Sequence, residues 1–201
     1  MTQEQQFLVP LDQYLKVGLH IGTKFRTKYM EQFIYKIRPD GLAVLNVQKI
    51  DERINVATKF LSQYAPQDII IACRRDNGHK AVELFAKLTN IHVIKGRYPP
   101  GALTNSNLDT FTETKLLFVV DPWPDKNIVL DAVKVGIPII ALCDTNNESN
   151  FLDLVVPCNN KGKKSLALLF YILTKEYLKN RGIIEKDSDL KEKPEDFDDE
   201  E

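Results

Sequence analysis

A short run near the N-terminus alternates cationic and aromatic side chains. Lys24, Arg26 and Lys28 carry positive charge, and the aromatic rings of Phe25 and Tyr29 are interleaved with them. Cations of this kind neutralise phosphates, and aromatic rings stack on unpaired bases, so the combination suits RNA better than a small metabolite. We therefore predict an RNA contact in this run, carried by Lys24, Arg26, Lys28 and Tyr29.

A second cationic tract reads NNKGKKS over residues 159–165, between an apolar run and a helical pattern. The amides and dipole of a helix N-terminus attract anions, and three lysines add to that attraction. We predict phosphate contacts here, although a lysine turn that only faces solvent is the competing interpretation. The candidate residues are Asn159, Asn160, Lys161, Lys163 and Lys164.

The same tract is close to the phosphate-loop pattern GxxxxGK[ST] of nucleotide-binding proteins. Pro157 stands where the pattern has its first glycine, and Lys164 stands where it has the serine or threonine that holds magnesium. Because two of the four defining positions fail, a nucleotide binder is a disfavoured alternative.

Two acidic residues, Asp121 and Asp144, each follow a short apolar run that is predicted to be a strand. A carboxylate pair at the end of neighbouring strands is typical of a magnesium-dependent phosphotransferase, which is the best enzyme alternative. Asp121 precedes a proline and Asp144 begins the turn DTNN, however, and acids in such positions commonly cap helices or close turns. With no third ligand and no positioned base, we expect no catalytic residue, bound metal or cofactor.

Four other residues also follow apolar runs that are predicted to be strands. Because the carboxyl ends of parallel strands lie at one edge of a sheet, we expect these residues near Asp121 and Asp144. Arg74 and Arg75 follow one run, and Arg97 and Tyr98 lie with Pro99-Pro100-Gly101 near the start of a long loop over residues 95–115. A loop of about twenty residues is more often functional than a simple connection. We predict that all four contact RNA or a neighbouring protein, with Tyr98 folded onto the core as the alternative.

The elements that would position these residues alternate along the chain. Apolar runs predict strands at 68–73, 91–94, 116–120, 137–142 and 154–157. Helical patterns lie at 78–88 and 126–135 between these strands, at 50–64 before them and at 164–179 after them. Continuous apolar strands that alternate with helices predict a three-layer αβα domain with a mainly parallel sheet, either flavodoxin-like or Rossmann-like. A helical arm and a hairpin around Pro39-Asp40-Gly41 precede it.

The charge of the chain is unevenly distributed. Residues 185–201 hold ten acids and three lysines, a net charge of −7, whereas residues 1–184 hold 24 basic and 18 acidic residues, a net charge of +6. We expect one α/β domain over 1–184, with an N-terminal arm at 1–30, and a disordered acidic tail at 185–201. No apolar run is long enough to span a membrane, and three isolated cysteines argue against disulfides or a zinc cluster, so a cytoplasmic protein is expected.

Several blocks of the sequence resemble the universal small-subunit ribosomal protein S-two family. The blocks are LDQYLKVGLHIG, IYKIRPDGLAVLNVQKIDERI, KGRYPPGALTN, IPIIALCDTNN and VVPCNNKGKKSLAL, in that order. The short stretch after LTN resembles the archaeal and eukaryotic branch of the family, and the lack of the long C-terminal extension of eukaryotic members favours an archaeal source. The resemblance implies a structural role in the small subunit of the ribosome. It implies rRNA and neighbouring ribosomal proteins as partners, with no membrane and no small-molecule substrate.

Overall fold

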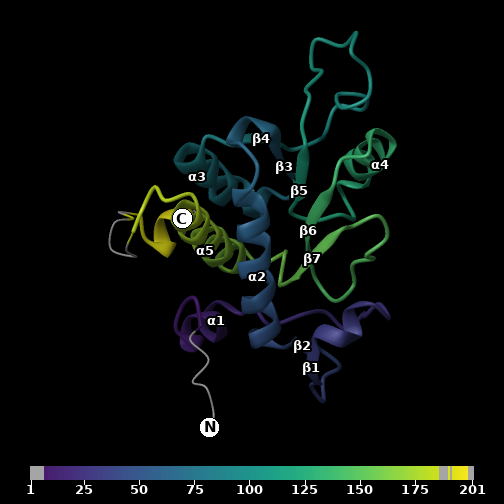
Figure 1. Cartoon of the computed structure of the whole chain (residues 1–201). Helices are drawn as coiled ribbons and strands as arrows, with labels where there is room; N and C mark the ends of the chain where they lie inside the picture. Colours follow the sequence, from purple (N-terminus) through teal and green to yellow (C-terminus); the bar gives the residue numbers. More distant parts are fainter. Residues whose placement is uncertain (1–6, 186–189, 191, 199–201) are drawn as a thin grey trace.

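The computed structural model describes residues 7–185, 190 and 192–198, and its arrangement is shown in Figure 1. The helices are α1 (Leu11–Val17), α2 (Val47–Ser62), α3 (His79–Thr89), α4 (Lys126–Val135) and α5 (Lys163–Asn180). The strands are β1 (Ile34–Ile37), β2 (Ala43–Leu45), β3 (Ile69–Cys73), β4 (His92–Lys95), β5 (Leu116–Val119), β6 (Ile139–Cys143) and β7 (Leu154–Pro157). The predicted elements are therefore present, with ends shifted by up to three residues.

Five of the strands form one parallel sheet in the order β4-β3-β5-β6-β7. Counted from β3, this is the order 2-1-3-4-5, which is the flavodoxin-like arrangement and not the classic Rossmann one. The inner strands are fully buried, as their continuous apolar sequences predicted. The order reverses between β3 and β5, which is where proteins of this architecture usually bind ligands.

Helices cover both faces of the sheet, which confirms the predicted three-layer α/β fold. The connections β3-α3-β4 and β5-α4-β6 run in opposite directions across the sheet, so right-handed crossovers put α3 and α4 on opposite faces. Helix α5 packs against both α2 and α3, and the three form one helical layer. No helix in the described ranges is long and apolar enough to cross a bilayer.

The N-terminal part of the chain forms a small unit beside β7. Strands β1 and β2 make an antiparallel hairpin, and Ile21 adds a bridge to Val44 on the other side of β2. The amide of Gly22 donates to the carbonyl of Ala43 at 2.9 Å, and the amide of Ala43 donates to the carbonyl of Thr23 at 3.1 Å. The chain that leads into the cationic run is therefore held against β2 by one isolated bridge and by backbone hydrogen bonds.

The connection from β4 to β5 crosses the sheet without a helix, and it is anchored by Tyr98. This side chain is 3% exposed; its hydroxyl lies 3.2 Å from Oδ2 of Asp131 on α4 and accepts a hydrogen bond from the amide of Leu103 at 3.0 Å. The prediction that Tyr98 contacts RNA is therefore wrong. Tyr98 instead fixes this connection onto α4, while Arg97 beside it is exposed.

The prediction of a disordered tail is wrong for the part of it that forms a helical turn. Residues Pro194–Phe197 form a 3₁₀ turn against α5, and the Phe197 ring is 2% exposed. This ring meets Tyr171 edge to face, with 6.0 Å between the ring centroids. One aromatic side chain thus anchors an otherwise acidic segment. Residues 186–189, 191 and 199–201 lie outside the described part of the chain.

Candidate nucleic-acid interface

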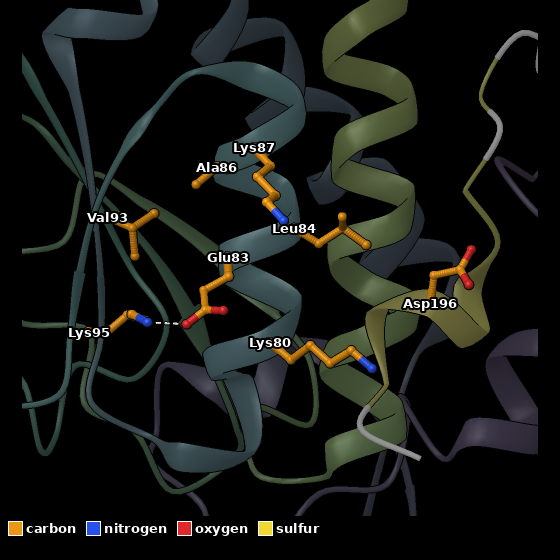
Figure 2. Close-up of a pocket in the computed structure, with 8 residues that line it drawn as sticks. All are labelled: Lys80, Glu83, Leu84, Ala86, Lys87, Val93, Lys95 and Asp196. Carbon is orange, nitrogen blue, oxygen red and sulfur yellow. Dashed lines mark hydrogen bonds and ion pairs between the residues drawn. The ribbon is translucent and has the colours of Figure 1, made fainter.

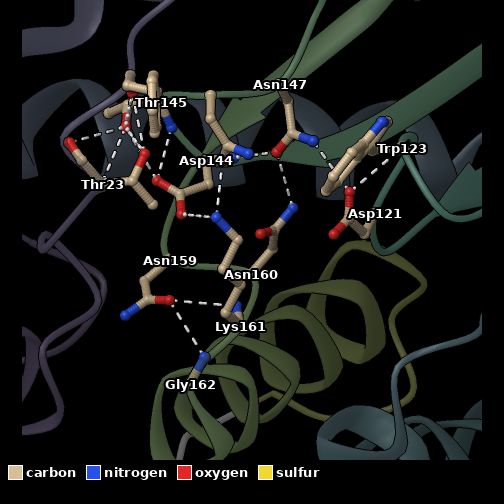
Figure 3. Close-up of polar contacts among 12 residues, drawn as sticks. Thr23, Asp121, Trp123, Asp144, Thr145, Asn147, Asn159, Asn160, Lys161 and Gly162 are labelled. Atoms are coloured by element: carbon tan, nitrogen blue, oxygen red, sulfur yellow. Dashed lines mark hydrogen bonds and ion pairs between the residues drawn. The ribbon is translucent and has the colours of Figure 1, made fainter.

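The carboxyl edge of the sheet is occupied by a network of the chain's own polar side chains (Figure 3). Asp144, at the end of β6, is 1% exposed, and its two oxygens have different partners. Oδ1 accepts from the Thr145 amide at 2.6 Å, and Oδ2 accepts from the Lys161 ammonium at 2.9 Å. Lys161 therefore neutralises a buried carboxylate, which accounts for its position in the cationic tract.

A second ion pair closes the place where the strand order reverses. The Arg75 side chain, which follows β3, donates through Nε to Oδ2 of Asp121 at 2.6 Å. The other oxygen of Asp121 accepts from the Trp123 amide at 3.1 Å and from Nδ2 of Asn147 at 2.9 Å. The position that would bind a ligand in a flavodoxin-like enzyme is thus filled by partners from within the chain.

The two asparagines of the 159–165 tract have structural roles. Asn160 is 0% exposed and donates to the carbonyl of Leu142 at 3.0 Å and to Oδ1 of Asn147 at 3.1 Å, so its predicted RNA contact is wrong. Oδ1 of Asn159 accepts from the amides of Lys161 and Gly162, both at 3.1 Å, and so shapes the turn into α5. The prediction of phosphate contacts for this tract did not include these internal hydrogen bonds of Asn159 and Asn160.

The cationic N-terminal run is fixed onto this same network. The amide of Thr27 donates to the carbonyl of Thr145 at 2.9 Å, and its hydroxyl donates to the carbonyl of Asn147 at 3.0 Å. Gly22 allows the close approach, because an added Cβ would lie 2.5 Å from Cγ2 of Thr145. Thr145 and Asn147 were not predicted as site residues, and the sequence DTNN gave no sign that a distant segment docks there.

Most of the predicted cations are exposed, and they lie along this edge of the fold. Lys24, Arg26, Lys28, Arg74, Arg97 and Lys164 are exposed, and Lys163 is partly so. Arg26 lies 3.9 Å from Glu31, Arg74 donates to the carbonyl of Pro124 at 2.9 Å, and the Tyr29 ring rests edge to face on Phe33. The structure thus places Arg75 and Lys161 in internal ion pairs and leaves the other cations available to a partner.

Neither the phosphotransferase nor the nucleotide-binder alternative gains support from these contacts. Asp121 and Asp144 are both paired with cations of the chain, and no set of three acidic, histidine or cysteine side chains within the described residues is arranged to hold a metal. In the tract that resembles a phosphate loop, Pro157 ends strand β7. The ammonium of Lys161 is bound to Asp144 and, at 2.7 Å, to Oδ1 of Asn146.

Two cavities lie away from this edge. One, of about 560 Å³, lies between α3 and the C-terminal turn, and is bordered by Lys80, Glu83, Lys87, Lys95 and Asp196 as Figure 2 shows. Glu83 and Lys95 form an ion pair across it. The other, of about 400 Å³, lies at the amino end of β6, beside Phe151. Both are open and shallow, and neither meets the polar network.

Asp125, between β5 and α4, makes the stability of the protein depend on pH. Burial raises the pKa of this carboxyl to about 6, although the amide of Arg74 donates to it at 3.2 Å. Since the unfolded chain has a pKa of 3.8 at this position, stability is lost as the pH rises from about 4 to about 6, by roughly 2 to 3 kcal/mol.

We expect Asp125→Asn to remove this loss of stability. Urea unfolding at pH 4 and pH 7 should show that the free energy of unfolding of the variant, relative to that of the wild type, is higher at pH 7 by roughly 2 to 3 kcal/mol. An equal difference between the two proteins at both pH values would contradict the assignment.

Together the fold and the site describe an α/β protein whose ligand edge is closed by its own ion pairs and bordered by exposed cations. A sequence model of the family described as Ribosomal protein S2 matches residues 14–112 and 110–179. The chain belongs to this family.

Three similar proteins carry the name small ribosomal subunit protein uS2. The one from Pyrobaculum islandicum is 47% identical over 201 residues, which cover 98% of this chain and 97% of the relative. The one from Nanoarchaeum equitans is 47% identical over 190 residues, 94% of each chain. The one from Saccharolobus solfataricus is 48% identical over 185 residues, 92% of this chain and 80% of the relative. All three sources are archaea, which supports the predicted archaeal branch.

Proposed function

We propose that this protein is a structural component of the small ribosomal subunit, which binds rRNA and neighbouring ribosomal proteins and performs no catalysis. Its family and the shared name of its relatives support this role. The internal pairing of Asp121 and Asp144 supports it too, because a carboxylate held by a cation of the chain is not free to bind a metal.

One observation carries the proposal of an RNA surface at the N-terminal run. Phe25 is 81% exposed, with the exposed cations Lys24 and Arg26 on either side of it. The backbone on both sides is held by the hydrogen bonds of Thr23 and Thr27 to Thr145 and Asn147. Because the backbone is already fixed, less conformational entropy is lost when this segment binds a partner, and the affinity is higher.

Salt dependence of RNA binding tests this surface. Each phosphate neutralised on single-stranded RNA contributes about 0.7 to the slope of log affinity against log salt. Replacing Lys24, Arg26 and Lys28 together by glutamine should therefore flatten that slope by about two. The slope can be measured with small-subunit rRNA fragments by filter binding between 50 and 300 mM KCl.

The matched control replaces two exposed lysines on the helical layer, Lys59 on α2 and Lys87 on α3. This variant should keep the wild-type slope, because these residues lie away from the carboxyl edge. A slope that stays the same in the N-terminal variant would show that the run faces solvent and not RNA.

A further inference from the structure

The β1–β2 hairpin exposes an aromatic side chain that no core contact explains. Tyr35 is 70% exposed, and Ile37 two residues later is 49% exposed. The register of the hairpin shifts between Ile34 and Lys36, so Tyr35 is the extra residue of a β-bulge. Bulges often re-aim a side chain beside a functional site. The hairpin therefore directs a large planar side chain into solvent, where exposure brings no gain in stability.

The hairpin belongs to the same small unit as the cationic N-terminal run. Ile21 pairs with Val44 of β2, and the backbones of Thr23 and Ala43 are hydrogen-bonded. The methylenes of the Lys24 side chain reach the hairpin turn, because a Cβ built on Gly41 would lie 3.9 Å from its Cγ and Cδ. Tyr35 is thus presented by the same small sheet that leads into Lys24 and Phe25.

This unit is cationic, and its charge indicates the partner. It presents exposed Lys24, Arg26, Lys28, Lys36 and Arg38. Of these, Arg38 lies 3.4 Å from Asp40 and Arg26 lies 3.9 Å from Glu31, while Lys24, Lys28 and Lys36 form no ion pair within the part of the chain that the structure describes. A surplus of free positive charge beside exposed rings fits a ligand that is both anionic and planar.

We propose that Tyr35, Lys36 and Arg38 form a second RNA contact, in which Tyr35 stacks on an unpaired base and the two cations neutralise adjacent phosphates. Arg38 exchanges its exposed ion pair with Asp40 for the phosphate, because an exposed pair contributes little stability. The inference rests on the proposed RNA-binding function and extends its surface from the N-terminal run to the hairpin. Aromatic stacking on bases tolerates any base sequence, so the contact favours single-stranded RNA over duplex RNA.

The test measures binding of a fluorescent 12-nucleotide oligoadenylate and of an RNA duplex of equal length, by anisotropy between 50 and 300 mM KCl. Tyr35→Leu keeps apolar bulk but removes the ring, and should weaken single-strand binding by about 5- to 150-fold, the range that one stacked base contributes. Tyr35→Phe keeps the ring and should bind within about twofold of wild type, since stacking needs the ring alone. Duplex binding should change by less than about twofold in both variants, because the bases of a duplex are paired and stacked and cannot reach the ring.

A charge variant and a distant aromatic variant complete the design. Replacing Lys36 and Arg38 by glutamine should flatten the salt slope for the single strand by about 1.4, at about 0.7 for each phosphate contact. Phe151→Leu is the matched control: this aromatic residue is 60% exposed at the other end of the sheet. It should leave affinity and slope unchanged.

The outcomes separate this inference from the function on which it rests. If wild type binds oligoadenylate and Tyr35→Leu binds equally well, the hairpin contact is wrong and the N-terminal run remains the RNA surface. If Tyr35→Leu binds RNA normally but fails to enter small subunits, the hairpin contacts a protein and the inference is overturned. If wild type binds no RNA at 50 mM KCl, both proposals fail.

Discussion

Replacing Tyr98 by alanine should lower the free energy of unfolding by about 3 to 5 kcal/mol, the usual cost of deleting a buried aromatic side chain. The ring is 3% exposed, and its loss also removes the hydrogen-bond acceptor of the Leu103 amide. For a chain of this size, each kcal/mol lowers the melting temperature by roughly 2 to 4 °C. Differential scanning calorimetry should therefore show a fall of about 10 °C.

Two other variants identify the cause of that fall. Tyr98→Phe retains the ring and should cost only about 1 to 3 kcal/mol, because the buried Leu103 amide loses its partner. Arg97→Ala, at the exposed position just before Tyr98, should change stability by less than about 0.5 kcal/mol. If Tyr98→Ala melted like wild type, the side chain would have to lie outside the core.

Replacing Lys161 by methionine should be the second large effect, because it leaves the Asp144 carboxylate buried without a cation. Breaking a fully buried ion pair costs about 3 to 5 kcal/mol. The Lys161 side chain is 31% exposed, so water can replace part of the lost interaction, and we expect about 2 to 3 kcal/mol. Urea unfolding at neutral pH measures this difference.

A second substitution shows whether the buried charge is the cause. Asp144→Asn in the Lys161→Met background removes that charge, keeps an acceptor for the Thr145 amide, and should recover about half of the lost stability, or roughly 1 kcal/mol. Lys164→Met, at an exposed position of the same tract, should stay within about 0.5 kcal/mol of wild type. An effect of Lys164→Met equal to that of Lys161→Met would contradict the account, since only Lys161 has a buried partner.

The layered fold could be predicted from the sequence because each element has a strong local signal. Strands β3 and β6 are continuous apolar runs, and α4 ends where the sequence has Gly136, which adopts a φ of 80°. The strand order could not be predicted as well, because flavodoxin-like and Rossmann-like sheets use the same alternation of strands and helices. Only the pairing of β3 with both β4 and β5 separates them.

The misassigned residues share a physical cause: their partners are distant in the sequence. Nothing near Tyr98 indicates that Asp131 on α4 would lie beside its hydroxyl, and nothing near Phe197 indicates the contact with Tyr171. A polar or aromatic residue in a loop looks like a binding residue until the fold supplies a partner. Their positions in a loop and in a cationic tract led us to predict that Tyr98 and Asn160 contact RNA, whereas both side chains are buried.

The candidate carboxylates show the opposite case, in which a local argument was sufficient. Asp121 and Asp144 both follow strands, and their local turns indicated a structural role over a metal site. The structure provides the partners: the Asp121 carboxylate accepts from the Trp123 amide two residues later, and Asp144 accepts from the Thr145 amide. The distant cations Arg75 and Lys161 could be identified only from the fold.

Sedimentation of the tagged protein from a cell lysate through a sucrose gradient shows whether the protein is a component of the small ribosomal subunit. We expect the protein to migrate with the small ribosomal subunit and to remain there when the two subunits are dissociated. We also expect that glutamine at positions 24, 26 and 28 shifts a substantial fraction to the top of the gradient, without lowering the melting temperature. Wild-type protein found only among the free proteins at physiological salt would contradict a role in the small subunit.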